Sequence, residues 1–132
     1  MKKILIVEDD QSIYNVYSAE LKLRGYEVEH AADGMNAIAS IEKFEPDLIL
    51  LDIILPGRNG LEILEEIVDR EDLQGIKVLM VTNYGNDSNV KKALELGAED
   101  YILKYNIVPS ELSEKVSQIL GEETDSPVKI TG

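Results

Sequence analysis

The sequence predicts an α/β fold, a doubly wound sheet of five parallel strands with helices on both faces. Short apolar runs, typical of strands buried on both sides, alternate along the chain with segments whose apolar residues recur at helical spacing. The connections between these segments are short, as they are in strand–helix–strand units. This alternation favours parallel strands, because each helix returns the chain to the starting edge of the sheet.

Five segments carry the residues expected of strands, at positions 4–7, 26–31, 48–51, 77–81 and 100–103. The first, third and fourth are nearly continuous apolar runs, so we expect them in the buried centre of the sheet. The second alternates apolar with polar residues and predicts an edge-like strand with one exposed face. It contains the single histidine, His30, which has no metal-binding spacing around it and receives no role.

Helical spacing predicts five helices, one after each strand. Their inward positions are expected to be Ile13, Val16, Tyr17, Leu21, Ala37, Ile38, Ile41, Phe44, Leu61, Leu64, Ile67, Val68, Val90, Ala93, Leu94, Leu112, Val116, Ile119 and Leu120. The first helix has either Asp10 or Ser12 as its N-cap, and Gly25 is expected to close it. The third is expected to run until Gln74-Gly75, the fourth to be capped within Asn86-Asp87-Ser88, and the fifth to open with Pro109.

Composition bounds the class of protein. The 132 residues suffice for one domain, which we expect to span residues 1–121, with residues 122–132 as a polar, flexible tail. A net charge of −13 repels phosphate backbones, so no direct nucleic-acid binding is expected. No segment predicts a membrane span or a signal peptide. The chain has no cysteine, which excludes thiol chemistry and is compatible with the cytoplasm.

Polar residues stand where the predicted strands end: Glu8-Asp9, Asp52, Thr82 and Lys104. Parallel strands bring their carboxyl ends to one edge of the sheet, where ligands bind. Clustered carboxylates repel one another, and a hard divalent cation such as Mg²⁺ relieves that repulsion. A lysine provides a positive charge for a phosphate, and a carboxylate can take up a phosphoryl group as a nucleophile. Asp52 is the first candidate for that role.

Four motifs at these strand ends resemble the receiver (response-regulator) domain of two-component signalling over residues 2–121. They are Ile-Leu-Ile-Val-Glu-Asp-Asp, Pro-Asp-Leu-Ile-Leu-Leu-Asp with Leu-Pro-Gly-x-Asn-Gly, Val-Thr, and Gly-Ala-x-Asp-Tyr-Ile-x-Lys. The resemblance implies a flavodoxin-like sheet with strand order 2-1-3-4-5.

The resemblance also implies roles for single residues. Asp52 is the phosphoacceptor, and Lys104 contacts the phosphoryl group. Mg²⁺ is held by Glu8, Asp9, Asp52 and the backbone carbonyl of Ile54. The switch residues are Thr82 and Tyr101: the hydroxyl moves inward after phosphorylation, and the aromatic side chain then rotates.

The implied partners are a histidine kinase or a histidine phosphotransfer protein and an unknown downstream protein. The downstream protein binds a surface made by the fourth helix, fifth strand and fifth helix, and the chain is a monomer or a phosphorylation-dependent dimer. No output domain follows the predicted fold within these 132 residues, so we expect either a single-domain regulator or a fragment of a longer one. We expect no enzyme activity beyond self-catalysed phosphoryl transfer to Asp52 and slow autodephosphorylation.

The chain departs from the family pattern at two positions. Tyr105 follows Lys104 where proline is usual, so we expect a trans peptide bond and an altered loop. Asn83 follows Thr82 where a small residue is usual, which narrows access to the site. In addition, Ile54 and Tyr84 are expected to flank the phosphoryl group, and neither can orient an attacking water, so the adduct should decay slowly.

Two other functions stay open. A pseudo-receiver is a binding module that no longer takes phosphate. A Mg²⁺-dependent phosphatase with an aspartyl nucleophile needs a second acid two positions after the nucleophile, and that position is Ile54.

Overall fold

The structure is a computed structural model that describes residues 1–83 and 88–121, and the strands in these ranges form one parallel sheet. They are β1 (Lys3–Val7), β2 (Glu27–Ala31), β3 (Leu48–Asp52), β4 (Lys77–Thr82) and β5 (Asp100–Leu103). Their order in the sheet is β2-β1-β3-β4-β5. The predicted doubly wound, flavodoxin-like fold is therefore confirmed.

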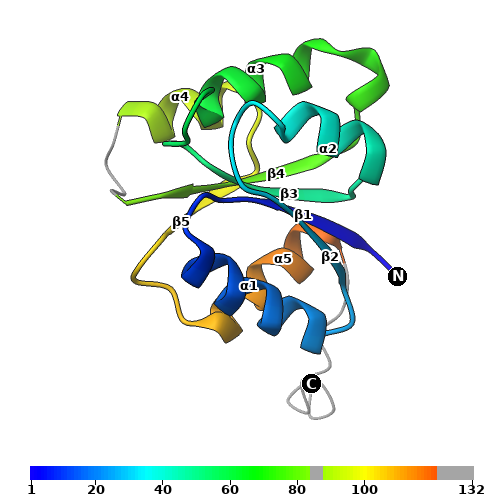
Figure 1. Ribbon diagram of the computed structural model, residues 1–132, viewed down its shortest axis with the longest axis vertical. Helices are drawn as coiled ribbons and strands as arrows, with labels where there is room; N and C mark the ends of the chain where they lie inside the picture. The colour runs from blue at the N-terminus through cyan, green and yellow to red at the C-terminus, as the bar shows by residue number, and fades with distance from the viewer. Residues whose placement is uncertain (84–87, 122–132) are drawn as a thin grey trace.

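Helices cover both faces of this sheet. They are α1 (Gln11–Leu23), α2 (Ala37–Phe44), α3 (Gly60–Asp69), α4 (Ser88–Leu96) and α5 (Pro109–Leu120), with a short 3₁₀ turn, η1 (Glu71–Leu73). Figure 1 shows α1 and α5 on one face and α2, α3 and α4 on the other. None of the helices within the described ranges is long and apolar enough to cross a lipid bilayer.

Side chains of the central strands alternate between two apolar clusters, one on each face of the sheet. Leu5 and Leu51 belong to the cluster under α2, α3 and α4, whereas Ile6 and Leu50 belong to the cluster under α1 and α5. All four are at most 1% exposed. Full burial of such a side chain contributes about 1.5–3 kcal/mol. The central strands are thus firmly held, and so are the residues that directly follow them.

Several predicted boundaries are confirmed. Asp10 is the N-cap of α1 and accepts hydrogen bonds from the N–H groups of Ser12 and Ile13. Gly25 follows that helix with φ +96°, a conformation that glycine adopts without a steric penalty. Pro109 occupies the start of α5. Of the cap predicted for α4, Asn86 and Asp87 lie outside the described residues.

Three predictions were wrong. The third helix ends at Asp69, ahead of Gln74-Gly75, because Arg70 adopts an extended backbone and begins the turn η1. Val16 is 50% exposed, since the buried stripe of α1 runs through Ile13, Tyr17 and Leu21 and leaves Val16 to one side. Leu94 is 40% exposed, because the buried face of α4 is made by Val90 and Ala93.

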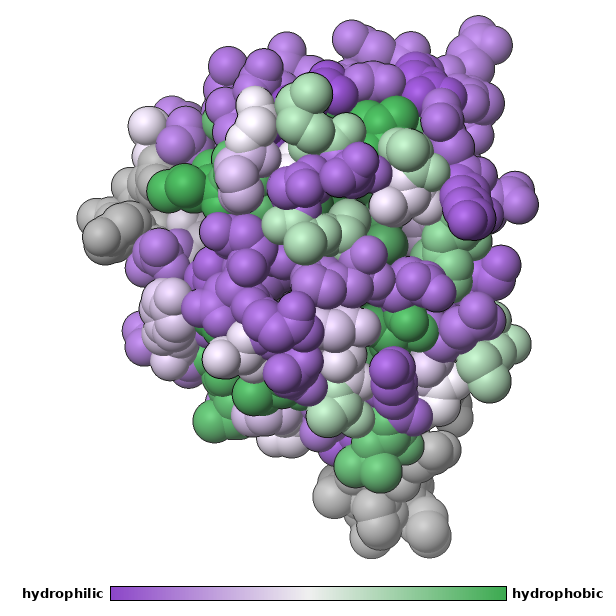
Figure 2. Space-filling view, viewed as in Figure 1, coloured by the Kyte–Doolittle hydropathy of each residue, from purple (hydrophilic) through white to green (hydrophobic). Residues whose placement is uncertain are grey.

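The strand register places all carboxyl ends along one edge. Val7 pairs with Leu51 in β3, Asp52 pairs with Val81 in β4, and Thr82 pairs with Leu103 in β5. The molecular face in Figure 2 is mainly hydrophilic and carries apolar side chains only in small, separate patches. Because the carboxyl ends of the strands meet at one edge of the sheet, the polar residues that follow them are the candidates for a functional site.

Candidate functional site

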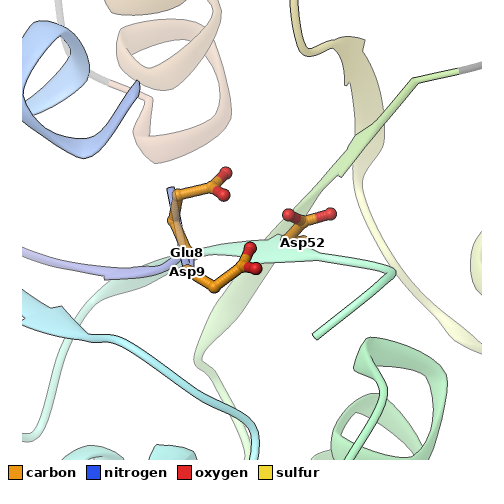
Figure 3. Close-up of side chains that lie close together, drawn as sticks. All are labelled: Glu8, Asp9 and Asp52. Carbon is orange, nitrogen blue, oxygen red and sulfur yellow. The ribbon is translucent and has the colours of Figure 1, made fainter. Parts of the chain in front are cut away.

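Three carboxylates meet at the carboxyl edge of the sheet. Glu8 and Asp9 directly follow β1, and Asp52 is the last residue of the neighbouring strand β3. One carboxylate oxygen from each of the three lies within 4.8 Å of the others. Figure 3 shows the side chains projecting into the space beyond the strands. The structure thus brings together the three acids that the sequence placed at two separate strand ends.

Lys104 adds a positive charge to these acids. Its Nζ lies 2.8 Å from Oε2 of Glu8 and 2.8 Å from Oδ2 of Asp52. The Lys104 side chain is only 8% exposed, and burial by itself lowers the pKa of the ammonium group. The hydrogen bonds to Asp52 and Glu8 outweigh this effect and hold the pKa above its ordinary value. Lys104 is therefore a permanent cation in the site.

The environment of Glu8 disfavours the ionised form of its carboxyl group. Burial is the main cause that raises the pKa of its carboxyl to about 7, and the charge of Asp52 adds to the effect. Hydrogen bonds from Lys104 and from the N–H of Asp10 act in the opposite direction. Its second oxygen, Oε1, is buried without a hydrogen-bond partner among the described residues. A buried carboxylate oxygen without a protein donor is usually satisfied by a cation or by an ordered water molecule.

The donor set fits a hard divalent cation. Three carboxylates offer oxygen ligands, and the single ammonium group of Lys104 cannot neutralise all of them. Mg²⁺ and Mn²⁺ are the ions that such a carboxylate set suits. Oε1 of Glu8 has no hydrogen-bond partner in the part of the chain that the structure describes, so this oxygen is available as a ligand atom.

The loop after β3 folds back onto the strand end. A Cβ at Gly60 would collide with the backbone carbonyl of Asp52, so this close approach requires glycine. The Gly60 N–H donates to the Ile53 carbonyl at 2.8 Å. The N–H of Ile54 contacts Oδ1 of Asp52 at 3.3 Å, which places Ile54 beside the carboxylate. Its side chain is 67% exposed at the mouth of the site.

The two predicted switch residues lie on one face of the sheet. Thr82 is buried at the end of β4, one residue past the β4 partner of Asp52. Tyr101 in β5 is half-buried and packs against the cluster under α2, α3 and α4. Thr82 and Met80, the register partner of Tyr101, alternate in phase along β4, so Thr82 and Tyr101 share this face.

The structure describes both residues that depart from the family pattern, Tyr105 and Asn83. The described residues contain no cis peptide bond, so Tyr105 follows Lys104 in the trans form, as expected. Tyr105 is 68% exposed. Asn83 is exposed at the end of β4. Tyr84, the second residue expected to flank the phosphoryl group, lies outside the described residues.

Two contacts at the site were not visible in the sequence. The hydroxyl of Tyr17 donates to the Lys104 carbonyl at 2.9 Å. His30 Nε2 lies 2.7 Å from the Glu8 carbonyl, and the His30 ring stacks on Tyr14 with centroids 3.8 Å apart. The sequence predicts Tyr17 only as a core residue and assigns no role to His30. Both contacts join residues that are distant in the sequence, and no local motif marks them.

Known proteins share the fold of this chain. A CheY-like receiver domain protein from Methanospirillum hungatei JF-1 is 38% identical with a TM-score of 0.83, and the match covers 92% of this chain and 94% of that chain. The BeF3-activated N-terminal receiver domain of RstA from Klebsiella pneumoniae is 34% identical with a TM-score of 0.82, over 90% and 98% of the two chains. The Mn²⁺-bound form of response regulator Rcp1 is 29% identical with a TM-score of 0.80, over 96% and 99%.

The family model for the response regulator receiver domain matches residues 4–117. The chain therefore belongs to the receiver domain family of two-component response regulators, as the resemblance of its motifs implied. This is a family of signalling domains rather than of typical enzymes.

Proposed function

We propose that this domain takes a phosphoryl group from a histidine kinase or a histidine phosphotransfer protein onto Asp52. The observation that carries the proposal is the position of Lys104 Nζ, 2.8 Å from Asp52 and from Glu8, beside a buried Glu8 oxygen that has no hydrogen-bond partner among residues 1–83 and 88–121. A nucleophile, a fixed positive charge and a cation site are the components that phosphoryl transfer requires.

In the proposed reaction, a carboxylate oxygen of Asp52 forms a bond to phosphorus. The phosphorus–nitrogen bond of the donor phosphohistidine breaks, and the imidazole nitrogen keeps the electron pair. Lys104 supplies positive charge to an oxygen of the transferred group, and it is held in place by its contact with Glu8. When bound, Mg²⁺ neutralises negative charge on the phosphoryl oxygens. Glu8, Asp9, Asp52 and the carbonyl of Ile54 are the residues that would hold it.

Phosphorylation of Asp52 then changes the conformation of the surface formed by α4, β5 and α5. The phosphoryl group adds about −1.5 to −2 charge beside Thr82. The Thr82 hydroxyl moves toward the new oxygens, and Tyr101 moves into the space that Thr82 leaves. Both residues lie on the α4 face of the sheet, so the surface formed by α4, β5 and α5 is the one that a downstream protein reads.

The proposed functional unit is residues 1–121, as a monomer or a phosphorylation-dependent dimer. Because kinases draw their phosphoryl groups from ATP, the proposal places the domain in the cytoplasm. Its chemistry is limited to one phosphoryl transfer and slow autodephosphorylation, since Ile54 provides no acid two positions after Asp52.

The test is an intact-mass measurement after incubation with Mg²⁺ and acetyl phosphate. The proposal predicts one phosphoryl adduct, lost in Asp52→Asn and retained in Asp47→Asn. Asp47 lies just before the same strand and accepts a hydrogen bond from the Lys3 N–H at 2.8 Å, so this variant is a matched control. Continuous release of phosphate would indicate the phosphatase. The absence of any adduct, also with histidine kinases as donors, would indicate the pseudo-receiver.

A further inference from the structure

The hydroxyl of Tyr17, on α1, donates a hydrogen bond to the backbone carbonyl of Lys104 at 2.9 Å. The Tyr17 side chain is 4% exposed and belongs to the apolar cluster under α1 and α5. Burial, reinforced by the charge of Glu8, raises the pKa of Tyr17 to about 12. The hydroxyl therefore keeps its proton at neutral pH and is able to donate.

Lys104 stands where β5 leaves the sheet, and its two backbone polar groups are held by different elements. Its N–H donates to the Thr82 carbonyl at 2.7 Å, which extends the pairing of β4 with β5. Its carbonyl accepts from Tyr17. The chain then turns, and the N–H of Asn106 donates to the Leu103 carbonyl at 3.2 Å. Helix α1 thus fixes the backbone direction at the point where the strand ends.

We propose that Tyr17 is a positioning residue that holds Lys104 in register with Asp52 for phosphoryl transfer. The proposal rests on the function proposed above. A lysine side chain is long and flexible, so the place of its ammonium group depends on the backbone that carries it. Small displacements of a positioned group lower reaction rates substantially. Tyr17 restrains that backbone at the Lys104 carbonyl, whereas Thr82 restrains it at the Lys104 N–H.

The hydrogen bond can be separated from the packing of the ring. Tyr17→Phe keeps the ring in the core and removes only the hydroxyl. Tyr26→Phe is the matched control, because Tyr26 is also buried and its hydroxyl shares a 2.9 Å hydrogen bond with Ser117 Oγ, on α5. Each variant removes one buried hydroxyl from the same face of the sheet, so both should lose similar stability.

The experiment measures the rate of adduct formation from acetyl phosphate with Mg²⁺. We expect Tyr17→Phe to be about three- to tenfold slower than the wild type, which is the range for one lost hydrogen bond, while Tyr26→Phe keeps the wild-type rate. In a Lys104→Met background, Tyr17→Phe should slow the reaction no further, because residues that act through one another are not additive. Hydrogen exchange of the Lys104 amide in the metal-free protein should be faster in Tyr17→Phe only.

Equal rates in Tyr17→Phe and Tyr26→Phe, with a normal adduct in the wild type, would overturn the role of Tyr17 and leave the proposed function intact. So would an additive effect of Tyr17→Phe in the Lys104→Met background. If the wild type forms no adduct, the proposed function fails and this role fails with it.

Discussion

The ammonium nitrogen of Lys104 lies 2.8 Å from Oδ2 of Asp52, and the two residues are 52 positions apart in the sequence. The contact crosses the carboxyl edge of the sheet from the end of β5 to the end of β3, past β4. It balances part of the charge of Asp52 and keeps a cation where a group attached to Asp52 would place its oxygens. We therefore expect the reactivity of Asp52 to depend on Lys104.

Replacing Lys104 by Met should slow formation of the adduct by about a hundredfold, the usual cost of losing one preorganised electrostatic contact. The measurement is a time course of intact mass with acetyl phosphate and Mg²⁺. Lys115→Met serves as the control. Lys115, on α5, contacts Asp100 at 2.9 Å, and Asp100 does not belong to the acidic cluster at the site. A Lys104→Met rate within about twofold of the wild-type rate would contradict this role.

Glu8 should make the metal-free protein less stable as the pH rises. The pKa of its carboxyl is about 7 in the folded state, above the ordinary value of 4.5. The folded state therefore binds more protons than the unfolded state between these values, and the free energy of unfolding falls as the pH increases through this window. In EDTA, the free energy of unfolding of Glu8→Gln should rise by about 3 kcal/mol relative to that of the wild type from pH 4 to pH 8.

Urea denaturation of both proteins checks this pH dependence. Glu95→Gln, an exposed carboxylate on α4, is the control and should follow the wild type. Added Mg²⁺ at pH 8 should stabilise the wild type more than Glu8→Gln. The same pH dependence in Glu8→Gln and the wild type would show that Glu8 is not the titrating group.

Thr82→Ala should separate phosphorylation from the surface change. Asp52 should still accept the phosphoryl group, but the ring resonances of Tyr101 should no longer shift when Mg²⁺ and beryllofluoride are added, since no hydroxyl moves toward the site. Nuclear magnetic resonance of the tyrosine rings makes this measurement. Ser113→Ala removes a buried hydroxyl from α5 and should respond like the wild type. A normal Tyr101 shift in Thr82→Ala would exclude this coupling.

The lifetime of the adduct should depend on the two residues that the sequence predicts to flank it. Replacing Ile54 and Tyr84 together by Asn introduces groups that can orient a water, and the adduct should then decay about tenfold faster. Leu23→Asn introduces the same amide at a side chain that is 81% exposed on α1, and it should leave the decay unchanged. Phosphate release from the purified adduct is the readout. Unchanged decay in the double variant would count against this explanation.

Much of the fold was predictable because its signals are local. The runs at Leu48–Asp52 and Lys77–Thr82 are mostly apolar on both faces, and a strand that is buried on both faces keeps such residues away from water. The predictions that were wrong concern features that depend on tertiary contacts, namely which helix positions are buried and where a helix ends. Val16 has the right spacing for α1, but the buried arc lies to one side of it. The end of α3 depends on Arg70, whose guanidinium binds Glu42 and Asp72.

The acidic cluster was predictable because strand ends of a parallel sheet share one edge. The contacts that support it were not. The bond from Tyr17 to the Lys104 carbonyl spans 87 positions, and the approach of His30 to the Glu8 carbonyl depends on the register of β2. A tyrosine at a core-facing position of a helix gives no sign of what its hydroxyl will meet.

The most direct test of the central claim is to locate the phosphoryl group. Borohydride reduces an aspartyl phosphate to homoserine, and peptide mass spectrometry then identifies the modified residue. We expect homoserine at position 52 and at no other acid, with the signal absent from protein that was not treated with the phosphodonor. Modification at Asp9 or Asp10 instead, with Asp52 unchanged, would contradict it.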